Sequence, residues 1–292
     1  MIDKLEMFIA LANERHFGRA ADVCGVTQPT LSSAIRQLED QLGVQLVFRG
    51  SRFQGLTAEG VRVLDWARRI VSDMRALRAE MKAVRSGLSG TVRIGVIPTA
   101  LPMVAELTAP FILRNPNVRV SILSRTSGEI LAGIESLELD AGITYLDNEP
   151  LGRVAQVPLY TEFYRLLCAP GTPLAGRDRV TWADVAEQPL CLLTADMQNR
   201  RIVDQHLAET GASVTPQVES NSMIALIAHV MTGHWSSVVP TELAKPALAG
   251  GLVAVPIIEP EAEHLVGLVM ARRDPLTPVL AALLAEAERL VR

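Results

Sequence analysis

The fold of this chain is decided by residues 20–60, which read AADVCGVTQPTLSSAIRQLEDQLGVQLVFRGSRFQGLTAEG. Within this stretch Thr27 can cap a helix, and Pro29 lies in the first turn, where its missing N–H group costs nothing. Apolar residues then recur at helical spacing as far as Leu42, and Gly43 ends the helix. The stretch therefore predicts an amphipathic helix that turns a polar face to solvent.

Further elements are expected on both sides of this helix. Apolar residues at spacings of three and four predict short helices over residues 5–14 and 18–24. Downstream, residues 44–49 and 53–56 read as the two strands of a hairpin. We therefore predict a winged helix-turn-helix DNA-binding domain over residues 1–58.

The polar face of the third helix has side chains suited to reading DNA. Short polar groups and Arg36 can reach base edges and phosphates when such a helix lies in the major groove. The formal net charge is +3 over residues 1–90 and −7 over residues 91–292, so the N-terminal part is the expected partner of a polyanion. For any single polar residue, a solvated helix face with no contact to DNA is the alternative.

The same stretch resembles the DNA-binding signature of LysR-type transcriptional regulators. The Ala-Ala pair, TQP, LS, I-RQLE, LG--L--R and LT--G occur in order and at family spacing. The chain departs from the family at Ser33 and Ala34, where a longer polar or basic residue is frequent, and at Val47, where Phe is frequent. The resemblance implies contacts with DNA from Gln28, Pro29, Thr30, Ser32, Ser33 and Arg36, and contacts with phosphates from Arg19, Arg49 and Arg52.

A long helix is expected to follow over residues 59–90. Apolar residues recur at alternating steps of four and three, the pattern of a coiled-coil seam. The seam consists of Val63, Ala67, Ile70, Met74, Leu77, Met81 and Val84. We predict that it pairs with a second subunit, and a core helix within one subunit is the alternative. Gly87 and Gly90 would then form a hinge.

The sequence pattern of residues 91–292 is typical of a two-lobed α/β domain. Short apolar strands such as VRIGVI and VRVSIL alternate with helical stretches, which predicts parallel strands with crossover helices. The order of these elements resembles the periplasmic-binding-protein-like effector domain of LysR-type regulators. We place lobe I at residues 91–162 and 267–292, and lobe II at residues 163–266.

A small-molecule effector is expected between the two lobes. In such sheets ligands bind beyond the carboxyl ends of the strands, near helix N-termini that favour an anion. By resemblance, Thr99 and Ser127 supply hydroxyl groups to an effector carboxylate, although each could simply cap a helix. The expected effector-binding residues are Thr99, Ala100, Leu101, Thr126, Ser127, Ala195, Asn199 and Trp235.

Three other side chains in lobe II have open roles. Arg200 and Arg201 lie in the run ADMQNRR, where either could bind an anion or pair with an acidic residue. His234, next to Trp235, is expected to be a packed or capping histidine. The combination of features resembles regulators found beside formate dehydrogenase operons.

The rival functions are a two-lobed enzyme and a solute-binding protein. The chain has no GxSxG, HExxH, GxxxxGK[ST] or GxGxxG motif, so no catalytic residue and no cofactor are predicted. Cys24, Cys168 and Cys191 are far apart and lack histidines at ligand spacing, so we expect buried thiols and no metal site. Asp3 and Glu6 are incompatible with the apolar segment of a secretory signal, which argues against a solute-binding protein and predicts a cytoplasmic location.

The composition fits this interpretation. With 49% hydrophobic and 21% charged residues the chain should be globular, and no stretch is long and apolar enough to span a membrane. The expected partners are operator DNA, a small anionic effector and a second copy of the chain, with a tetramer as a family expectation. The effector, the operator and the direction of regulation stay open at this level.

Overall fold

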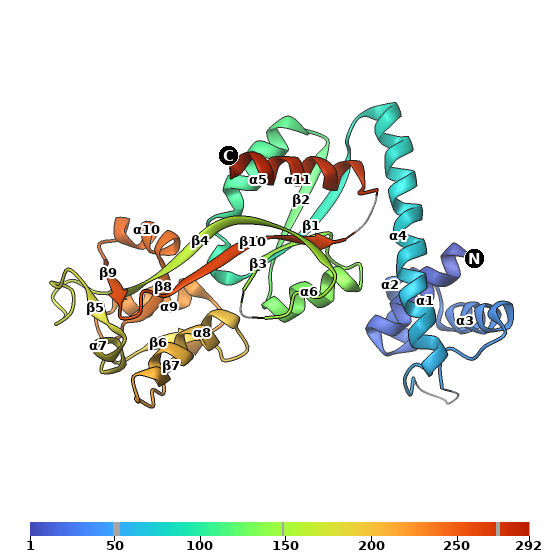
Figure 1. Ribbon diagram of the computed structural model, residues 1–292. Helices are drawn as coiled ribbons and strands as arrows, with labels where there is room; N and C mark the ends of the chain where they lie inside the picture. The colour runs from blue at the N-terminus through green and yellow to red at the C-terminus, as the bar shows by residue number, and fades with distance from the viewer. Residues whose placement is uncertain (49–52, 148, 273–274, 292) are drawn as a thin grey trace. The chain divides into compact units, whose positions relative to one another are not determined.

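The computed structural model describes residues 1–48, 53–147, 149–272 and 275–291 and divides into two compact units (Figure 1). The N-terminal unit consists of Met1–Ser89 with the short segments Glu135–Glu138 and Arg273–Pro278. The remaining residues form the second unit. Among the described residues, no helix has the length and apolar character needed to cross a membrane.

Three helices form the core of the N-terminal unit, as the sequence predicts. They are α1 (Ile2–Glu14), α2 (Phe17–Val23) and α3 (Gln28–Leu42). Phe8, Leu31 and Leu38 are fully buried in their shared core. The Thr27 hydroxyl accepts a hydrogen bond from the Thr30 N–H at 3.4 Å and caps α3, which Gly43 ends with a φ of 69°. The helix that the DNA-binding signature defines is therefore present with both of its ends.

In its described part, the predicted hairpin after α3 is less extensively paired than expected. Its described part contains one antiparallel bridge, between Val47 and Leu56, in place of two strands. The Glu39 carboxylate accepts hydrogen bonds from the Leu46 and Val47 N–H groups at 2.8 and 3.2 Å, so a side chain of α3 binds the Leu46 N–H, a backbone donor that a longer ladder would use. The tip of the hairpin, residues 49–52, lies outside the described residues.

The long helix α4 spans Ala58–Ser86, and its apolar residues serve two purposes. Near its start, Val63 and Ala67 pack into the core of their own unit, together with Leu64 and Val71, which are not part of the predicted seam. Four seam residues farther along the helix are exposed, namely Ile70, Leu77, Met81 and Val84. The predicted seam is thus internal core at one end and an uncovered apolar stripe at the other.

Lobe I of the second unit contains a parallel sheet with helices on both faces. Strand β1 (Gly90–Val96) lies between β2 (Val118–Ser124) and β3 (Ala141–Tyr145) and is parallel to both. Figure 1 shows α5 (Val104–Arg114) and α11 (Pro278–Leu290) on one face and α6 (Ser127–Glu135) on the other. The short helix η1 (Pro98–Ala100) follows β1 directly. These are the crossover units that the alternation of strands and helices predicts.

Lobe II has shorter strands and its own helices. Strands β6 (Cys191–Leu193) and β7 (Val218–Ser220) pair in parallel. The other elements of this lobe are β5 (Val180–Thr181), β8 (Ser237–Pro240), β9 (Val253–Ile258), α7 (Trp182–Ala186), α8 (Gln198–Glu209), α9 (Met223–Met231) and α10 (Thr241–Ala249). The helices α8 and α9 begin where β6 and β7 have ended, so the parallel pair again places helix N-termini at one edge of the strands.

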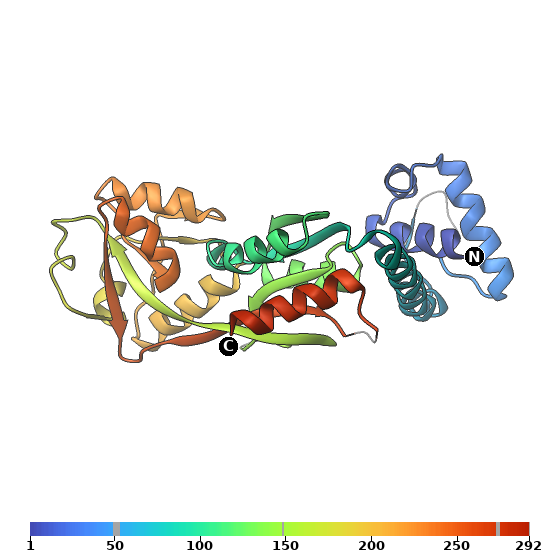
Figure 2. The same ribbon diagram turned by 90° about the horizontal axis from the view of Figure 1, so that it is seen from above.

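Two long antiparallel strands connect the lobes. The alternation of strands and helices in the sequence predicts parallel crossover units and does not indicate these connecting strands. Strand β4 (Val154–Cys168) pairs with β10 (Glu263–Ala271), and β10 also pairs with β3, so the sheet is mixed. Figure 2 shows both strands running from one lobe into the other. The lobe boundaries set from sequence, 162/163 and 266/267, fall inside these strands, and the register shifts between Val266 and Gly267.

Candidate DNA-binding and effector sites

The outer face of α3 carries the side chains expected to contact DNA. Gln28, Pro29, Thr30, Ser33 and Arg36 are exposed, and Ser32 is half-buried. Thr30 is tied to the helix cap, because its hydroxyl lies 2.9 Å from that of Thr27. Gln37 is a further exposed residue on this face, which the sequence reasoning missed, and its amide donates to the Ser33 hydroxyl at 3.4 Å.

Of the three arginines expected to contact phosphates, the structure describes only Arg19. Arg19 is exposed, but its guanidinium is paired with the Glu14 carboxylate at 3.1 Å and donates to the Glu14 carbonyl at 2.6 Å. Arg49 and Arg52 lie outside the described residues.

A cavity of about 750 Å³ lies between the two lobes. Lobe I contributes residues that follow the carboxyl ends of β1 and β2, and lobe II contributes residues that follow the carboxyl ends of β6 and β7. This is the position at which α/β sheets bind ligands. The lining residues used below are Leu101, Arg125, Thr126, Asp196, Met197, Asn221, Ser222, Met223 and Ile224. Two of them, Leu101 and Thr126, are among the effector-binding residues expected from sequence.

Both lobes line the cavity with polar as well as apolar residues. On the lobe I side the lining includes Arg125, whose guanidinium donates to the Ser124 carbonyl at 3.1 Å. On the lobe II side, Asn221 and Ser222 lie at the N-terminus of α9, and the Ser222 side chain does not cap that helix. Unbonded N–H groups at a helix N-terminus attract negative charge. The arrangement suits a small molecule with an anionic group and an apolar body that packs on Met197, Met223 and Ile224.

Thr99 and Asn199 do not line this cavity but meet beside it at one phenol. The Asn199 amide donates to the Tyr145 hydroxyl at 3.2 Å, and the Thr99 hydroxyl lies 3.4 Å from it. The Tyr145 hydroxyl donates in turn to the carboxylate of Glu162, and all four residues are buried. Asn199 comes from lobe II and Tyr145 from lobe I, so this network joins the lobes at their connecting strands.

Glu162 is an acidic residue buried in that network. Burial raises the pKa of Glu162 to about 7, although hydrogen bonds from Tyr145, Tyr164 and Thr99 partly oppose the rise. Burial and the nearby Glu162 charge also hold the pKa of Tyr145 well above its ordinary value, so its hydroxyl stays a donor. Neither residue is among the site residues expected from sequence. The sequence feature that could have indicated a buried acid is the single charged residue, Glu162, between aromatic residues in the strand segment YTEFY.

The other expected effector-binding residues lie in varied surroundings. Ala100 is fully buried and Ala195 is exposed, and neither lines the cavity. Trp235 packs against the core of lobe II, and its indole donates to Gln217 at 2.9 Å. His234 is exposed, with its ring edge-on to that of Trp235. The assignment of these residues to an effector site therefore rests on resemblance.

Thr126 precedes α6 and Ser127 is its first residue, and both already have protein partners. The Thr126 hydroxyl accepts from the Glu129 N–H at 3.2 Å, while the Glu129 carboxylate accepts from the Thr126 N–H at 2.9 Å. This reciprocal pair caps the helix. Ser127 donates to the carboxylate of Glu149 at 3.1 Å.

The two adjacent arginines of α8 have different environments. Arg200 is buried and donates to Asp204 and to the Leu193 carbonyl, both at 2.7 Å, and it also pairs with Glu219. Its donors serve the fold of lobe II. Arg201 is half-exposed and pairs with Glu149.

Two family models together match nearly the whole chain. The model described as "Bacterial regulatory helix-turn-helix protein, lysR family" matches residues 2–61, and the model described as "LysR substrate binding domain" matches residues 85–291. The chain belongs to the LysR family of bacterial transcriptional regulators. It is therefore a DNA-binding regulator and not an enzyme.

Full-length relatives support the same membership. This LysR-type regulator is 33% identical over 277 residues to the "DNA-binding transcriptional dual regulator OxyR" of Escherichia coli (strain K12), a match that covers 94% of this chain and 90% of the relative. It is 31% identical over 278 residues to the "Hydrogen peroxide-inducible genes activator" of Dickeya chrysanthemi, with 94% and 90% covered.

Solved structures share the fold of the regulator. A full-length OxyR variant from Pseudomonas aeruginosa superimposes with a TM-score of 0.77 at 24% identity and covers 100% of this chain and 99% of that one. CbnR in complex with its target DNA gives a TM-score of 0.62 at 22% identity, with 99% of each chain covered. At these identities the likeness shows the fold alone.

The three cysteines of the regulator are free thiols in the described part of the chain. Cys168 and Cys191 are fully buried, and burial raises the pKa of both, that of Cys191 to about 11. Burial also raises the pKa of the half-buried Cys24. Each thiol is thus shifted away from the reactive thiolate form.

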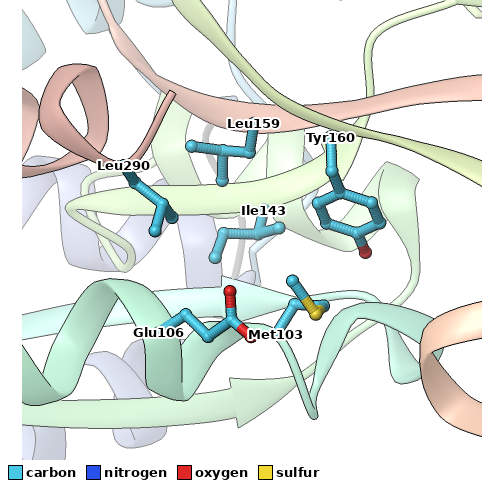
Figure 3. A pocket seen from close by; sticks show the side chains of 6 residues that line it. All are labelled: Met103, Glu106, Ile143, Leu159, Tyr160 and Leu290. Atoms are coloured by element: carbon cyan, nitrogen blue, oxygen red, sulfur yellow. The ribbon is translucent and has the colours of Figure 1, made fainter. Parts of the chain in front are cut away.

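A second, smaller cavity of about 90 Å³ lies within lobe I (Figure 3). Met103, Ile143, Leu159 and Leu290 give it apolar walls, and Glu106 and Tyr160 contribute its polar atoms. Burial, and then the charge of Glu162, raises the pKa of Tyr160, so its phenol stays neutral. The volume corresponds to a few water molecules and is far smaller than that of the inter-lobe cavity.

Proposed function

We propose that this regulator binds operator DNA through α3 and that a small anionic effector, such as a carboxylate, controls this binding from the cavity between the lobes. The observation that carries the proposal is the cavity itself, a space of about 750 Å³ lined both by Arg125 of lobe I and by the residues at the N-terminus of α9 in lobe II. Because both lobes line the cavity, an occupant can favour one angle between them. The effector can shift the equilibrium between two arrangements of the lobes only as far as its affinities for those arrangements differ.

The test is a footprint of the promoter region of the regulator's own gene with and without sodium salts of small carboxylates, from formate to benzoate. We expect at least one carboxylate to change the protected region or the bend of the DNA, while sodium chloride at the same ionic strength does not. Identical footprints with every carboxylate would contradict the proposed effector class.

Hydrogen peroxide is a second candidate signal, because several relatives are named as peroxide-inducible gene activators. Peroxide oxidises thiolates, and the buried thiols of this chain are shifted away from that form. We therefore favour a bound ligand over thiol oxidation. A peroxide-dependent footprint that is lost in Cys168→Ser or Cys191→Ser would reverse this choice.

We infer that the regulator acts as a dimer through the exposed stripe of α4. Leu77 is 52% exposed and Val84 is 79% exposed, which is costly for large apolar side chains unless a partner covers them. A dimer also places two copies of α3 on two half-sites of one operator, which a single helix in a single groove cannot do. Because it acts on the chromosome, we place the regulator in the cytoplasm.

Leu77→Asp should separate the dimer, because it introduces a charge into the apolar stripe. We expect the dimer dissociation constant, measured by analytical ultracentrifugation, to rise by at least about tenfold, equivalent to ~1.4 kcal/mol. Ala76→Asp adds the same charge on a neighbouring, half-buried position of α4 and serves as the control. A Leu77→Asp protein that stays dimeric at the same concentrations would show that other surfaces hold the subunits together.

Arg36→Ala should weaken operator binding and relax sequence preference. Arg36 is exposed on the DNA face of α3, and loss of an arginine that contacts a base typically costs about 1–3 kcal/mol. Fluorescence anisotropy with operator and random duplexes measures both effects. Arg179→Ala, which removes an exposed arginine of lobe II, is the matched control and should bind like the parent. Unchanged affinity and preference in Arg36→Ala would count against α3 as the reading helix.

A further inference from the structure

Glu162 is a buried acid on β4, one of the two strands that connect the lobes. Its side chain is 2% exposed, and only one of its oxygens, Oε1, accepts a hydrogen bond of ordinary geometry, from the Tyr145 hydroxyl. The other oxygen, Oε2, is buried without such a bond among the described residues. A charged carboxylate can accept several hydrogen bonds, and burying it with one donor is costly. The site therefore suits the neutral carboxyl better than the charged one.

The hydrogen bond from Tyr145 links Glu162 to lobe II. The Tyr145 hydroxyl accepts a hydrogen bond from the Asn199 amide at 3.2 Å, and all three residues are buried. Asn199 lies in the first turn of α8, directly after the cap residue Met197 and Gln198, and Met197 lines the inter-lobe cavity. A buried chain of hydrogen bonds thus runs from a connecting strand to the lobe II side of the cavity. We call Glu162, Tyr145 and Asn199 the inter-lobe link.

The acidic residues around the link favour a neutral Glu162. The nearby charge of Asp147, which follows β3, disfavours a second negative charge on Glu162. Glu106 of α5 and Glu242 of α10 add negative charge near Tyr160, the residue of β4 that precedes Glu162 by two positions. Repulsion between like charges thus acts in the same direction as burial.

The nearby arginines do not offset this repulsion. Arg165, farther along β4, donates to the Thr241 hydroxyl at 3.1 Å. Arg200 and Arg201, which follow Asn199 on α8, are paired with other acidic residues. Within the part of the chain that the structure describes, no arginine or lysine is paired with Glu162.

Two histidines lie near the link, and each faces an acidic residue. His264 of β10 is opposite Glu162 in the strand pairing, and its Nδ1 atom is 3.3 Å from the carboxylate of Asp147. His206 of α8 stacks on Trp182 with 4.8 Å between ring centroids, and its Nδ1 atom is 3.4 Å from the carboxylate of Glu209. Because histidines as a class also bind protons near neutral pH, only a substitution of Glu162 itself distinguishes its proton from theirs.

A proton on Glu162 is expected to favour the arrangement of the lobes seen here. In this arrangement burial raises the pKa of Glu162 to about 7. In an arrangement that admits water to Oε2, the pKa would return toward its ordinary value of 4.5. The present arrangement then loses up to about tenfold relative to the other for each pH unit between these two values, as pH rises.

We propose that the inter-lobe link is a proton-controlled switch: with a proton on Glu162 it holds Asn199 of lobe II against Tyr145 of lobe I, and loss of that proton releases Asn199 and changes the angle between the lobes. Ionised Glu162 needs more donors than Tyr145 alone supplies. Water can provide them once Asn199 no longer closes the network on the lobe II side.

The switch gives the regulator a second input besides a bound ligand. A change of lobe angle matters for DNA only if the lobes control α3, so the regulatory consequence rests on the proposed function. On that basis we expect operator affinity to change with pH in the parent protein and to change at least about threefold less in Glu162→Gln. The lobe movement itself does not depend on that function.

The test measures the distance between the lobes as a function of pH. Spin labels are attached to Ala109→Cys on α5 and Ala183→Cys on α7, two exposed positions, in a full-length Cys24→Ser background whose other cysteines are fully buried. The labelled protein is diluted into unlabelled protein so that pulsed electron paramagnetic resonance reports distances within one chain. We expect the ratio of the two distance populations to change at least about fivefold between pH 5.5 and 7.5.

Two variants assign the change to the link. Glu162→Gln cannot ionise and should keep the pH 5.5 distribution at both pH values, whereas Glu187→Gln, which changes an exposed acid of lobe II, should follow the parent. Asn199→Ala removes the contact with lobe II and should show the parent's pH 7.5 distribution already at pH 5.5. A parent distribution that is the same at both pH values overturns the inference. A shift that survives Glu162→Gln or Asn199→Ala overturns it too, because another group would then bind the proton.

The switch and the proposed function can fail separately. If the distances follow pH through Glu162 but operator affinity responds equally in the parent and Glu162→Gln, the switch stands and its regulatory role fails. If carboxylates change the parent footprint while the distances ignore pH, the proposed function stands and the switch is wrong.

Discussion

Gly60→Ala is expected to abolish operator binding at the temperatures where the parent binds. A Cβ atom on Gly60 would lie 2.0 Å from the carbonyl oxygen of Leu46, closer than any tolerated contact, and the neighbour is backbone that cannot rotate away. The Leu46 carbonyl also accepts from the Thr57 N–H at 3.0 Å, so the clash falls on the junction between α4 and the hairpin. We expect a loss of stability at or above the upper end of the ~1–3 kcal/mol that overpacking usually costs.

Urea unfolding followed by circular dichroism, together with operator binding by anisotropy, measures this effect. Gly176→Ala is the control, because an added Cβ there meets no atom within 4 Å. We expect the control to match the parent in both measurements. A Gly60→Ala protein with parental stability and affinity would show that the close packing of α4 on the hairpin is not part of the folded regulator.

Glu162→Gln should remove a large pH dependence of stability. The folded protein holds the pKa of Glu162 at about 7, whereas the unfolded chain has the ordinary value of 4.5, so the folded state retains a proton that the unfolded state releases between these values. Stability therefore falls as pH rises from about 4.5 to 7, by about 3 kcal/mol, and is level on either side. Glutamine cannot ionise, so the variant lacks this fall.

The measurement is the difference in unfolding free energy between Glu162→Gln and the parent as a function of pH. We expect the free energy of unfolding of Glu162→Gln to rise relative to that of the parent between pH ~4.5 and ~7. Above pH ~7 the difference between the two should be constant. Glu187→Gln, which changes an exposed acid, should follow the parent at every pH. Parallel curves for the parent and Glu162→Gln would mean that the buried carboxyl does not bind the extra proton.

The DNA-binding unit could be predicted closely because its signals are local. Thr27 and Gly43 mark the ends of α3 by their own chemistry, and the buried side chains Leu31 and Leu38 follow the period of the helix. The hairpin was predicted less well, because Glu39 binds backbone N–H groups seven and eight residues away. The pattern of apolar and polar residues in a strand does not indicate that a helix carboxylate will bind its backbone N–H groups.

The effector domain could be predicted in outline only. The parallel strands and their helices have a local alternation, but the 15-residue strand β4 owes its length to pairing with β10, about a hundred residues later. For the same reason the sequence indicated Leu101 and Thr126, which line the inter-lobe cavity, but did not reveal Tyr145 or Glu162. Those two meet only when strands of the folded domain lie side by side.

The paired arginines show the same limit. From sequence, Arg200 and Arg201 were equivalent, and either could have bound an anion. In the folded protein Arg200 is buried among Asp204, Glu219 and the Leu193 carbonyl, while Arg201 reaches Glu149 beside the cavity. Which of two neighbours on a helix is buried and which stays exposed depends on how the helix packs.

The most direct test of the account is thermodynamic reciprocity between the two sites. The operator affinity of the regulator is measured with and without a saturating carboxylate that it binds, and the carboxylate affinity is measured with and without operator DNA. If the effector between the lobes controls α3 on DNA, both affinities change by the same factor, typically about 5-fold or more. A carboxylate that binds the free regulator and the operator complex equally would contradict the account.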